Sequence, residues 1–148
     1  MTAPRASCMS PLTLVVPSDL VVLPVVRAFV EAACRLGRFD QKATDALVLA
    51  TNEAVSNVIR HAHRNQPEIQ LHVQCVLRED AIEVQLHDEG APFNVCDVPH
   101  LDPAELRLGG RGVFLMRALV DELACCRRGA SGNTLRMIKR RTSAPGNC

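Results

Sequence analysis

Three polar side chains in the stretch TNEAVSNVIRHAHRN follow one another at intervals of four residues: Glu53, Asn57 and His61. Successive residues of an α-helix are about 100° apart, so this spacing aligns the three side chains in one row. The apolar face beside that row consists of Leu47, Ala54, Val55, Val58 and Ala62. A carboxylate, an amide and an imidazole in this position could reach a polar ligand held at the edge of the core. The same row also fits the polar border of an ordinary surface helix.

The carboxylate of Asp88 is a second candidate for chemistry. Asp88 shares the two-residue phase of a preceding apolar run, Ile82, Val84 and Leu86. A strand that continues to Asp88 directs its side chain into the core layer, where a carboxylate requires a specific partner. With Gly90 two residues on and Phe93 nearby, such a group would suit the exocyclic amine of a flat ring. Alternatively, the strand ends by Leu86 and Asp88 merely opens the turn DEGAPF.

The third candidate is the segment LGGRGVFLMRALVDEL, which places Gly109, Gly110 and Gly112 immediately before a helical pattern. Backbone N–H groups at a helix N-terminus, exposed by glycines, can bind the oxygens of a phosphate. The spacing matches neither a Walker A loop nor a dinucleotide-binding GxGxxG turn. A plain helix entry is the alternative interpretation.

The remaining periodicities predict the elements that must position these groups. LTLVVP is a short strand, and a helix follows from about Ser18 to Leu36, with Gly37 as its stop signal. Pro24 lies too far inside that helix for its first position, so its opening turn is expected to be irregular. Asp40 can cap a second helix that runs to about His63. On this helix, Ser56 and His63 are expected opposite the apolar face.

Alternation predicts two strands in EIQLHVQCVL and in the residues after RED, followed by a loop over 89–110 with one helical turn near 103–106. GVFLMRALVDEL is expected to be a third helix, and ACCRR and NTLRMIKR a final hairpin around GASG. This order predicts an α+β two-layer sandwich, a mixed, mostly antiparallel sheet with helices on one face. We expect one domain over 11–141, with flexible tails over 1–10 and 142–148.

Composition argues against several classes of function. The net charge is +1 and the aromatic residues are four Phe, which does not favour nucleic-acid binding. The most apolar run, Leu20 to Val26, is too short for a membrane span and is interrupted by Pro24. The seven cysteines include no CxxC pair, so zinc or a disulfide framework is not expected, and a cytoplasmic location fits better.

The three motifs, in this order along the chain, resemble the GHKL family of ATP-binding domains. The likeness is greatest to the anti-sigma-factor serine kinases within that family and covers roughly residues 12–140. The resemblance implies a Bergerat-type fold that binds ATP and Mg²⁺. It also gives the polar row a role, because that row is similar to the family's N box, which faces the triphosphate.

Residue by residue, the resemblance implies that Asn57 coordinates Mg²⁺ and that Glu53 is the general base toward the acceptor hydroxyl. His61 occupies a position that commonly contacts phosphate, and Asp88 matches the aspartate that accepts from the adenine amino group. The other implied nucleotide-binding positions are Gly90, Pro92, Phe93, Gly109, Gly110, Arg111, Gly112 and Val113.

The sequence departs from the family pattern in two places. Asn94 follows Phe93 where relatives often have Asp, and the usual Gly-Thr near the end of the domain is Gly132-Asn133-Thr134 here. Strand phase places Asn133 on the core side, so Asn133 can help to hold adenine. Thr134 is the alternative if the register slips by one residue.

The implied activity is that of a protein-serine kinase, which phosphorylates a small STAS-type antagonist and thereby regulates a sigma factor by partner switching. The short segment 94–108, and the lack of a phosphoacceptor-histidine helix before the domain, favour this branch. The alternative is a non-catalytic, nucleotide-dependent switch or a stand-alone ATP-binding domain of histidine-kinase type. Glu53 favours the kinase, because a switch needs no base. The unpaired edge of the first strand is compatible with formation of a homodimer.

Overall fold

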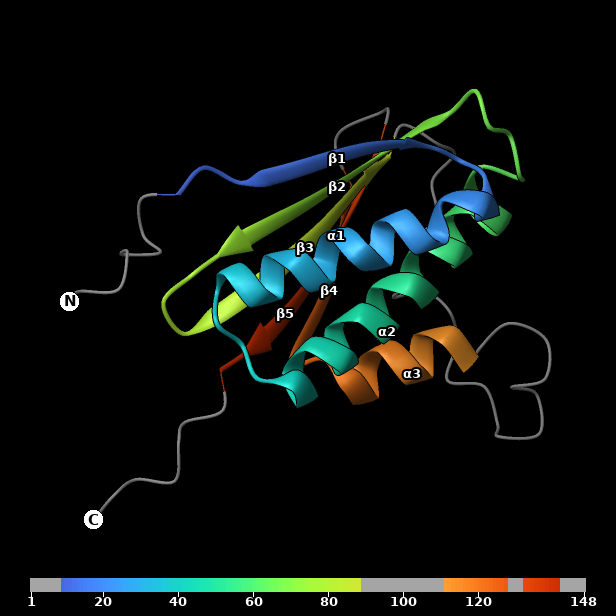
Figure 1. Cartoon of the computed structure of the whole chain (residues 1–148). Coiled ribbons are helices and arrows are strands. Elements are labelled where there is room, and N and C mark those ends of the chain that lie inside the picture. The colour runs from blue at the N-terminus through green and yellow to red at the C-terminus, as the bar shows by residue number, and fades with distance from the viewer. Residues whose placement is uncertain (1–8, 89–110, 128–131, 142–148) are drawn as a thin grey trace, which may run out of the picture.

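The computed structural model describes residues 9–88, 111–127 and 132–141 of the chain (Figure 1). Five strands form one sheet in the order β1-β2-β3-β5-β4, and the three α-helices cover one of its faces. All four strand pairings are antiparallel, with no parallel pair among the described strands. The predicted α+β two-layer sandwich is therefore confirmed.

The bounds of the elements follow the order read from the sequence. The strands are β1 (Leu12–Pro17), β2 (Gln70–Leu77), β3 (Ala81–Asp88), β4 (Glu122–Arg127) and β5 (Asn133–Arg140). The helices are the 3-10 turn η2 (Leu20–Val22), α1 (Leu23–Leu36), α2 (Gln41–Asn57), the π-helix η3 (Val58–Ala62) and α3 (Arg111–Leu119). No helix in these described ranges is both long enough and apolar enough to span a membrane.

Two helix boundaries differ from the prediction. Asp19 caps the first helical turn by accepting a hydrogen bond from the Val21 backbone N–H, so the helical segment begins at Leu20 and not at about Ser18. A 3-10 turn follows, and α1 begins only at Leu23, so Pro24 lies in its first turn, where a missing N–H is harmless. The third helix ends at Leu119, earlier than predicted, because the Asp121 backbone N–H donates to Ile138 in the sheet. The predicted cap at Asp40 is confirmed, since its Oδ1 accepts from the Ala43 N–H at 2.7 Å.

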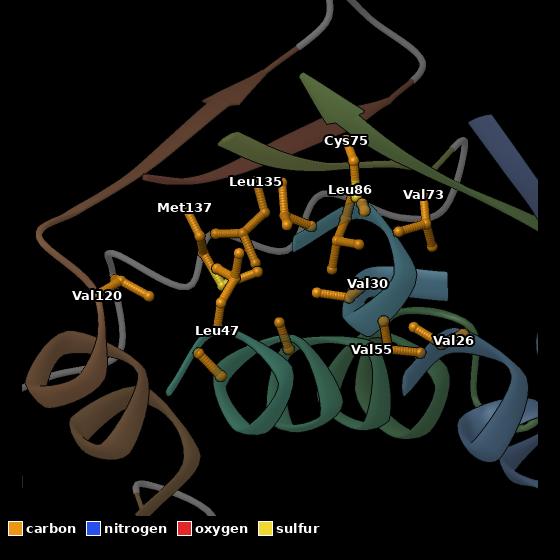
Figure 2. Packing of buried hydrophobic residues seen from close by; sticks show 14 of the residues in the cluster. Val26, Val30, Leu47, Val55, Val73, Cys75, Leu86, Val120, Leu135 and Met137 are labelled. Carbon is orange, nitrogen blue, oxygen red and sulfur yellow. The ribbon is translucent and has the colours of Figure 1, made fainter. Parts of the chain in front are cut away.

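Alternating residues of the central strands form the core against the helices (Figure 2). From β2, β3 and β5 the buried side chains include Leu71, Val73, Cys75, Ile82, Val84, Leu86, Leu135 and Met137. Helix α2 lies between α1 and α3 and packs against both. Because it is covered on two sides as well as by the sheet, Ser56 is buried, in contrast to the prediction that it lies away from the core.

None of the described helices covers the opposite face of the sheet, yet that face buries a carboxylate. Glu83 of β3 is 0% exposed and lies beneath Arg78 and Arg136. Gln85 also donates to its Oε1, at 2.8 Å. Burial alone would raise the pKa of the Glu83 carboxyl, but the hydrogen bonds from Arg136, Arg78 and Gln85 outweigh it and lower the pKa to about 2.

Just after β5, Arg141 joins two separate turns to the end of that strand. Its guanidinium donates to the backbone oxygens of Gly37 and Arg38, each at 2.7 Å, and stacks 4.2 Å from the centre of the Phe39 ring. Its backbone N–H donates to Asp80 in the turn between β2 and β3. The turn between α1 and α2 is thereby fixed against the end of β5.

We predict that Gly37→Ala destabilises the fold by about 1–3 kcal/mol. Gly37 has a φ of −80°, which alanine adopts freely, so backbone entropy alone would favour the substitution. A Cβ at this position would lie 2.7 Å from Cε2 of the buried Phe39 ring, which Arg141 holds in place. Urea unfolding measures the change. In a Phe39→Leu background the cost should largely disappear, and an equal cost in both backgrounds would contradict the steric explanation.

We predict that the stabilisation due to Glu83 is lost at acid pH. Because its folded pKa is about 2 and its ordinary value is 4.5, the stabilisation is present above pH 4.5 and is lost as the pH falls toward 2. Glu83→Gln should therefore lower the free energy of unfolding by about 1–3 kcal/mol at neutral pH, and the difference from wild type should shrink below pH 4.5. The exposed neighbour Glu79 supplies the control, since Glu79→Gln should have little effect throughout.

Candidate functional site

The helix that carries the polar row changes from an α-helix to a π-helix after Asn57. The next five residues form the π-helix η3, and the His63 N–H donates to the Val58 carbonyl at 2.9 Å. Arg64 and Asn65 then adopt left-handed backbone conformations, with φ of 48° and 56°. A π-helical turn contains more residues than an α-helical turn, so it rotates the side chains that follow. His63 is 1% exposed as a result, and the prediction that it lies opposite the apolar face is wrong.

The three row residues differ in their surroundings. Glu53 is half-buried, Asn57 is 8% exposed, and His61 is exposed. Because the π-helix lies between Asn57 and His61, the four-residue spacing no longer holds them in one straight row. The side chains of Glu53 and Asn57 make no hydrogen bond or ion pair with another described residue. Their polar groups are therefore not occupied by each other or by the described core.

Asp88 is the last residue of β3 and is directed to the helix-covered face, as its phase predicted. The alternative that the strand ends by Leu86 is wrong. Asp88 pairs with Leu71 of β2 on one side and with Asn133 of β5 on the other, and it is 5% exposed. The Asn133 side-chain amide donates to Asp88 Oδ1 at 3.3 Å.

The register of β5 also places its two candidate adenine-binding residues. Asn133 shares the face of Asp88, whereas Thr134 lies on the other face and hydrogen-bonds to the His87 ring at 3.0 Å. The one-residue slip that would exchange them does not occur. Of the two, Asn133 is the residue beside the carboxylate.

Two residues connected to Asp88, one directly and one through the other, were not predicted as site residues from the sequence. His63 Nε2 lies 3.3 Å from Asp88 Oδ1, and His63 Nδ1 forms a hydrogen bond with the hydroxyl of Ser18, which follows β1. The Nε2 atom is buried without a hydrogen bond, because its alignment with Asp88 falls short of one. An unmet buried polar atom costs about 1–3 kcal/mol. A carboxylate flanked by an amide and an imidazole therefore fits a polar group on a bound ligand.

The direction of α3 brings its N-terminus to this end of the sheet. Helix α3 leads into β4, which begins opposite Ile138, at the end of β5 farthest from Asn133. The helix must therefore start near the Asp88 end, and Figure 1 shows it beside α2 and antiparallel to it. Its first turn consists of Arg111, Gly112 and Val113. The other predicted positions, Gly90, Pro92, Phe93, Gly109 and Gly110, lie outside the described residues.

The arrangement defines a class of protein. Residues 16–139 match the family model of the histidine kinase-like ATPase domain, and the chain belongs to this family. The predicted resemblance to GHKL ATP-binding domains is thus confirmed.

Individual proteins can also be compared with the chain. The chain is 26% identical over 120 residues to the serine-protein kinase RsbW of Listeria monocytogenes, covering 76% of each protein. It is 34% identical over 100 residues to the RsbW of Staphylococcus epidermidis, covering 62% of each. The crystal structure of the RsbU and RsbW domains of Rv1364c from Mycobacterium tuberculosis superposes with a TM-score of 0.65 at 20% identity. That match covers 90% of this chain and 32% of the mycobacterial one, and it supports the fold.

We predict that Asn133, and not Thr134, contributes to the affinity for an adenine nucleotide. Asn133→Ala removes the amide beside Asp88 and should weaken binding by about 5- to 10-fold, the usual worth of one hydrogen bond. Thr134→Val keeps the side-chain shape on the opposite face and should bind as wild type does. Titration with a fluorescent ATP analogue measures both. A loss in Thr134→Val with none in Asn133→Ala would reverse the assignment.

Proposed function

We propose that the protein is a Mg²⁺-ATP-dependent serine kinase acting on a small protein. The observation that best supports this is the buried Asp88 carboxylate, flanked by Asn133 and adjoining the end of the helix that carries Glu53 and Asn57. A carboxylate so placed can accept from the adenine amino group in a site that excludes water. The relatives called serine-protein kinase support the reaction class.

The proposal gives a role to each of the site residues on α2, η3 and α3. Bound ATP would supply the phosphoryl group, and Mg²⁺ would neutralise charge that develops on the phosphates. The side-chain oxygen of Asn57 is a ligand of the kind that Mg²⁺ prefers. Glu53, one helical turn before Asn57, accepts the proton of the acceptor serine. Backbone N–H groups at the start of α3 and the ring of His61 hold phosphate oxygens.

Several further features belong to the same proposal. The substrate is a STAS-type antagonist of an anti-sigma factor, and its phosphorylation controls a sigma factor by partner switching. Residues 11–141 form the kinase domain, and the protein acts in the cytoplasm. It binds neither nucleic acid nor membrane directly. The edge strand β1 pairs only with β2 among the described strands, and a second copy can meet it there.

The second candidate function is a nucleotide-dependent switch that binds a partner without phosphorylating it. A switch requires Asn57 and Asp88 but no base. The half-buried Glu53, which no described residue neutralises, favours the kinase over the switch.

We predict that nucleotide binding and phosphoryl transfer separate along α2. Glu53→Gln keeps the shape of the side chain and loses only the base, so ATP affinity should hold while serine phosphorylation falls by about 10²–10⁴-fold. Asn57→Ala should weaken Mg²⁺-ATP binding and abolish transfer. Single-turnover phosphorylation of a STAS-type protein, beside an ATP titration on the same preparations, measures both effects.

The matched control for Glu53→Gln is Asp45→Asn, which removes one negative charge from the exposed part of α2. This variant should transfer phosphate at the wild-type rate. If wild-type protein binds ATP but yields no phosphoserine with any STAS-type partner, the switch is the correct function. If Glu53→Gln transfers at the wild-type rate, the base is another residue.

A further inference from the structure

Three buried polar side chains from distant parts of the chain form a continuous line at the end of the sheet. They are Ser18, which follows β1, His63, which follows η3, and Asp88, which ends β3. Ser18 and His63 are 0% and 1% exposed. The Ser18 hydroxyl is bonded to Nδ1 of the ring, and Nε2 faces Asp88 Oδ1 at 3.3 Å. No residue of this line other than Asp88 has a role in the proposed reaction.

The backbone around the line is held firmly. The Ser18 N–H donates to Ile69 at 2.9 Å, just before β2. The carbonyl of His63 accepts from the Gln66 N–H at 3.0 Å, and its N–H closes the π-helical turn. Asp88 is fixed between two strands. The backbone of the three residues is therefore fixed, and the buried His63 ring lies with its Nε2 beside the carboxylate.

Hydrogen bonding selects one form of the ring. A carboxylate oxygen only accepts, so a proton on Nε2 is favoured where that nitrogen faces Asp88. Nδ1 is then the acceptor, and the Ser18 hydroxyl donates to it. In the structure Nε2 does not complete a hydrogen bond to Asp88. A small rotation of the carboxylate would complete it, because the two atoms are already 3.3 Å apart.

We propose that Ser18 and His63 are positioning residues that orient the Asp88 carboxylate toward the amino group of a bound purine. This inference rests on the proposed nucleotide site. When the amino group donates to Asp88, the carboxylate turns and its Oδ1 receives the Nε2–H of His63. The imidazole thus acts through Asp88, and Ser18 acts through the imidazole by keeping the proton on Nε2. Purine selectivity then depends on residues that the nucleotide does not touch.

Two substitutions of His63 test the roles of its two ring nitrogens separately. Glutamine can place its amide N–H near the position of Nε2, whereas asparagine reaches only as far as Nδ1. His63→Gln should keep ATP affinity within about 3-fold of wild type, and His63→Asn should lose about 10-fold, equivalent to one hydrogen bond. Ser18→Ala, which leaves the ring without its donor at Nδ1, should lose about 3- to 10-fold.

The discriminating measurement is a ratio of affinities. Each variant is titrated with ATP and with purine riboside triphosphate, which lacks the amino group but is otherwise the same. Affinity for the second nucleotide should not change in any variant, so only the ratio should fall. The two titrations use one preparation, and partial unfolding therefore affects both affinities alike. Rescue by His63→Gln but not by His63→Asn would support positioning through Nε2.

Three results would contradict the inference, and a fourth would refute the proposed function on which it rests. Equal losses for both nucleotides would show that Ser18 and His63 merely support the fold. An unchanged ratio in His63→Asn, with full affinity retained, would show that Asp88 is oriented without them. Failure of wild-type protein to bind either nucleotide would refute the proposed function itself. A ¹⁵N spectrum of wild-type protein that places the His63 proton on Nδ1 would also contradict the proposed hydrogen-bond direction.

Discussion

The register of β3 between β2 and β5 is the constraint on which the site depends. Side chains alternate between the two faces of a strand, so a shift of one residue would exchange the faces of every β3 side chain. Asp88 would then leave the helix-covered layer, and Glu83 would enter it. Antiparallel pairing on both sides opposes such a shift, with Leu71 and Asn133 fixed beside Asp88. The apolar residues Val84 and Leu86 reinforce the same register, because they must face the helices.

The two buried carboxylates of β3, those of Glu83 and Asp88, have different surroundings. Glu83 faces cationic partners, and its negative charge is neutralised within the protein. Asp88 lies beside an amide and an imidazole, and Nε2 of that imidazole has no completed hydrogen bond. A carboxylate that is fully neutralised internally contributes to stability. A carboxylate beside an amide and an imidazole is suited to a ligand group that donates a hydrogen bond.

Local sequence patterns were sufficient to predict much of the fold and part of the candidate site. The phase of Asp88 with Leu86, the capping of α2 by Asp40 and the core position of Asn133 each follow from local patterns that the fold preserves. The position of His63 does not. It depends on a π-helical turn and on left-handed residues after it, and neither has a reliable signal in the sequence. The end of α3 was likewise missed, because pairing of Asp121 with β5 overrides a helical pattern that continues beyond it.

The order of strands in the sheet has a consequence for how the chain acquires its structure. β5 is the last described strand to be synthesised, yet it lies beside the central strand β3 and separates it from β4. The contacts of Arg141 with Gly37 and Arg38 span more than 100 residues of sequence. The hairpin of β2 and β3 and the pair of helices α1 and α2 can form locally as they emerge, but the sheet closes only after β5 arrives. The early helices therefore keep apolar surface exposed during synthesis, and such a topology folds slowly relative to a helical bundle of equal length.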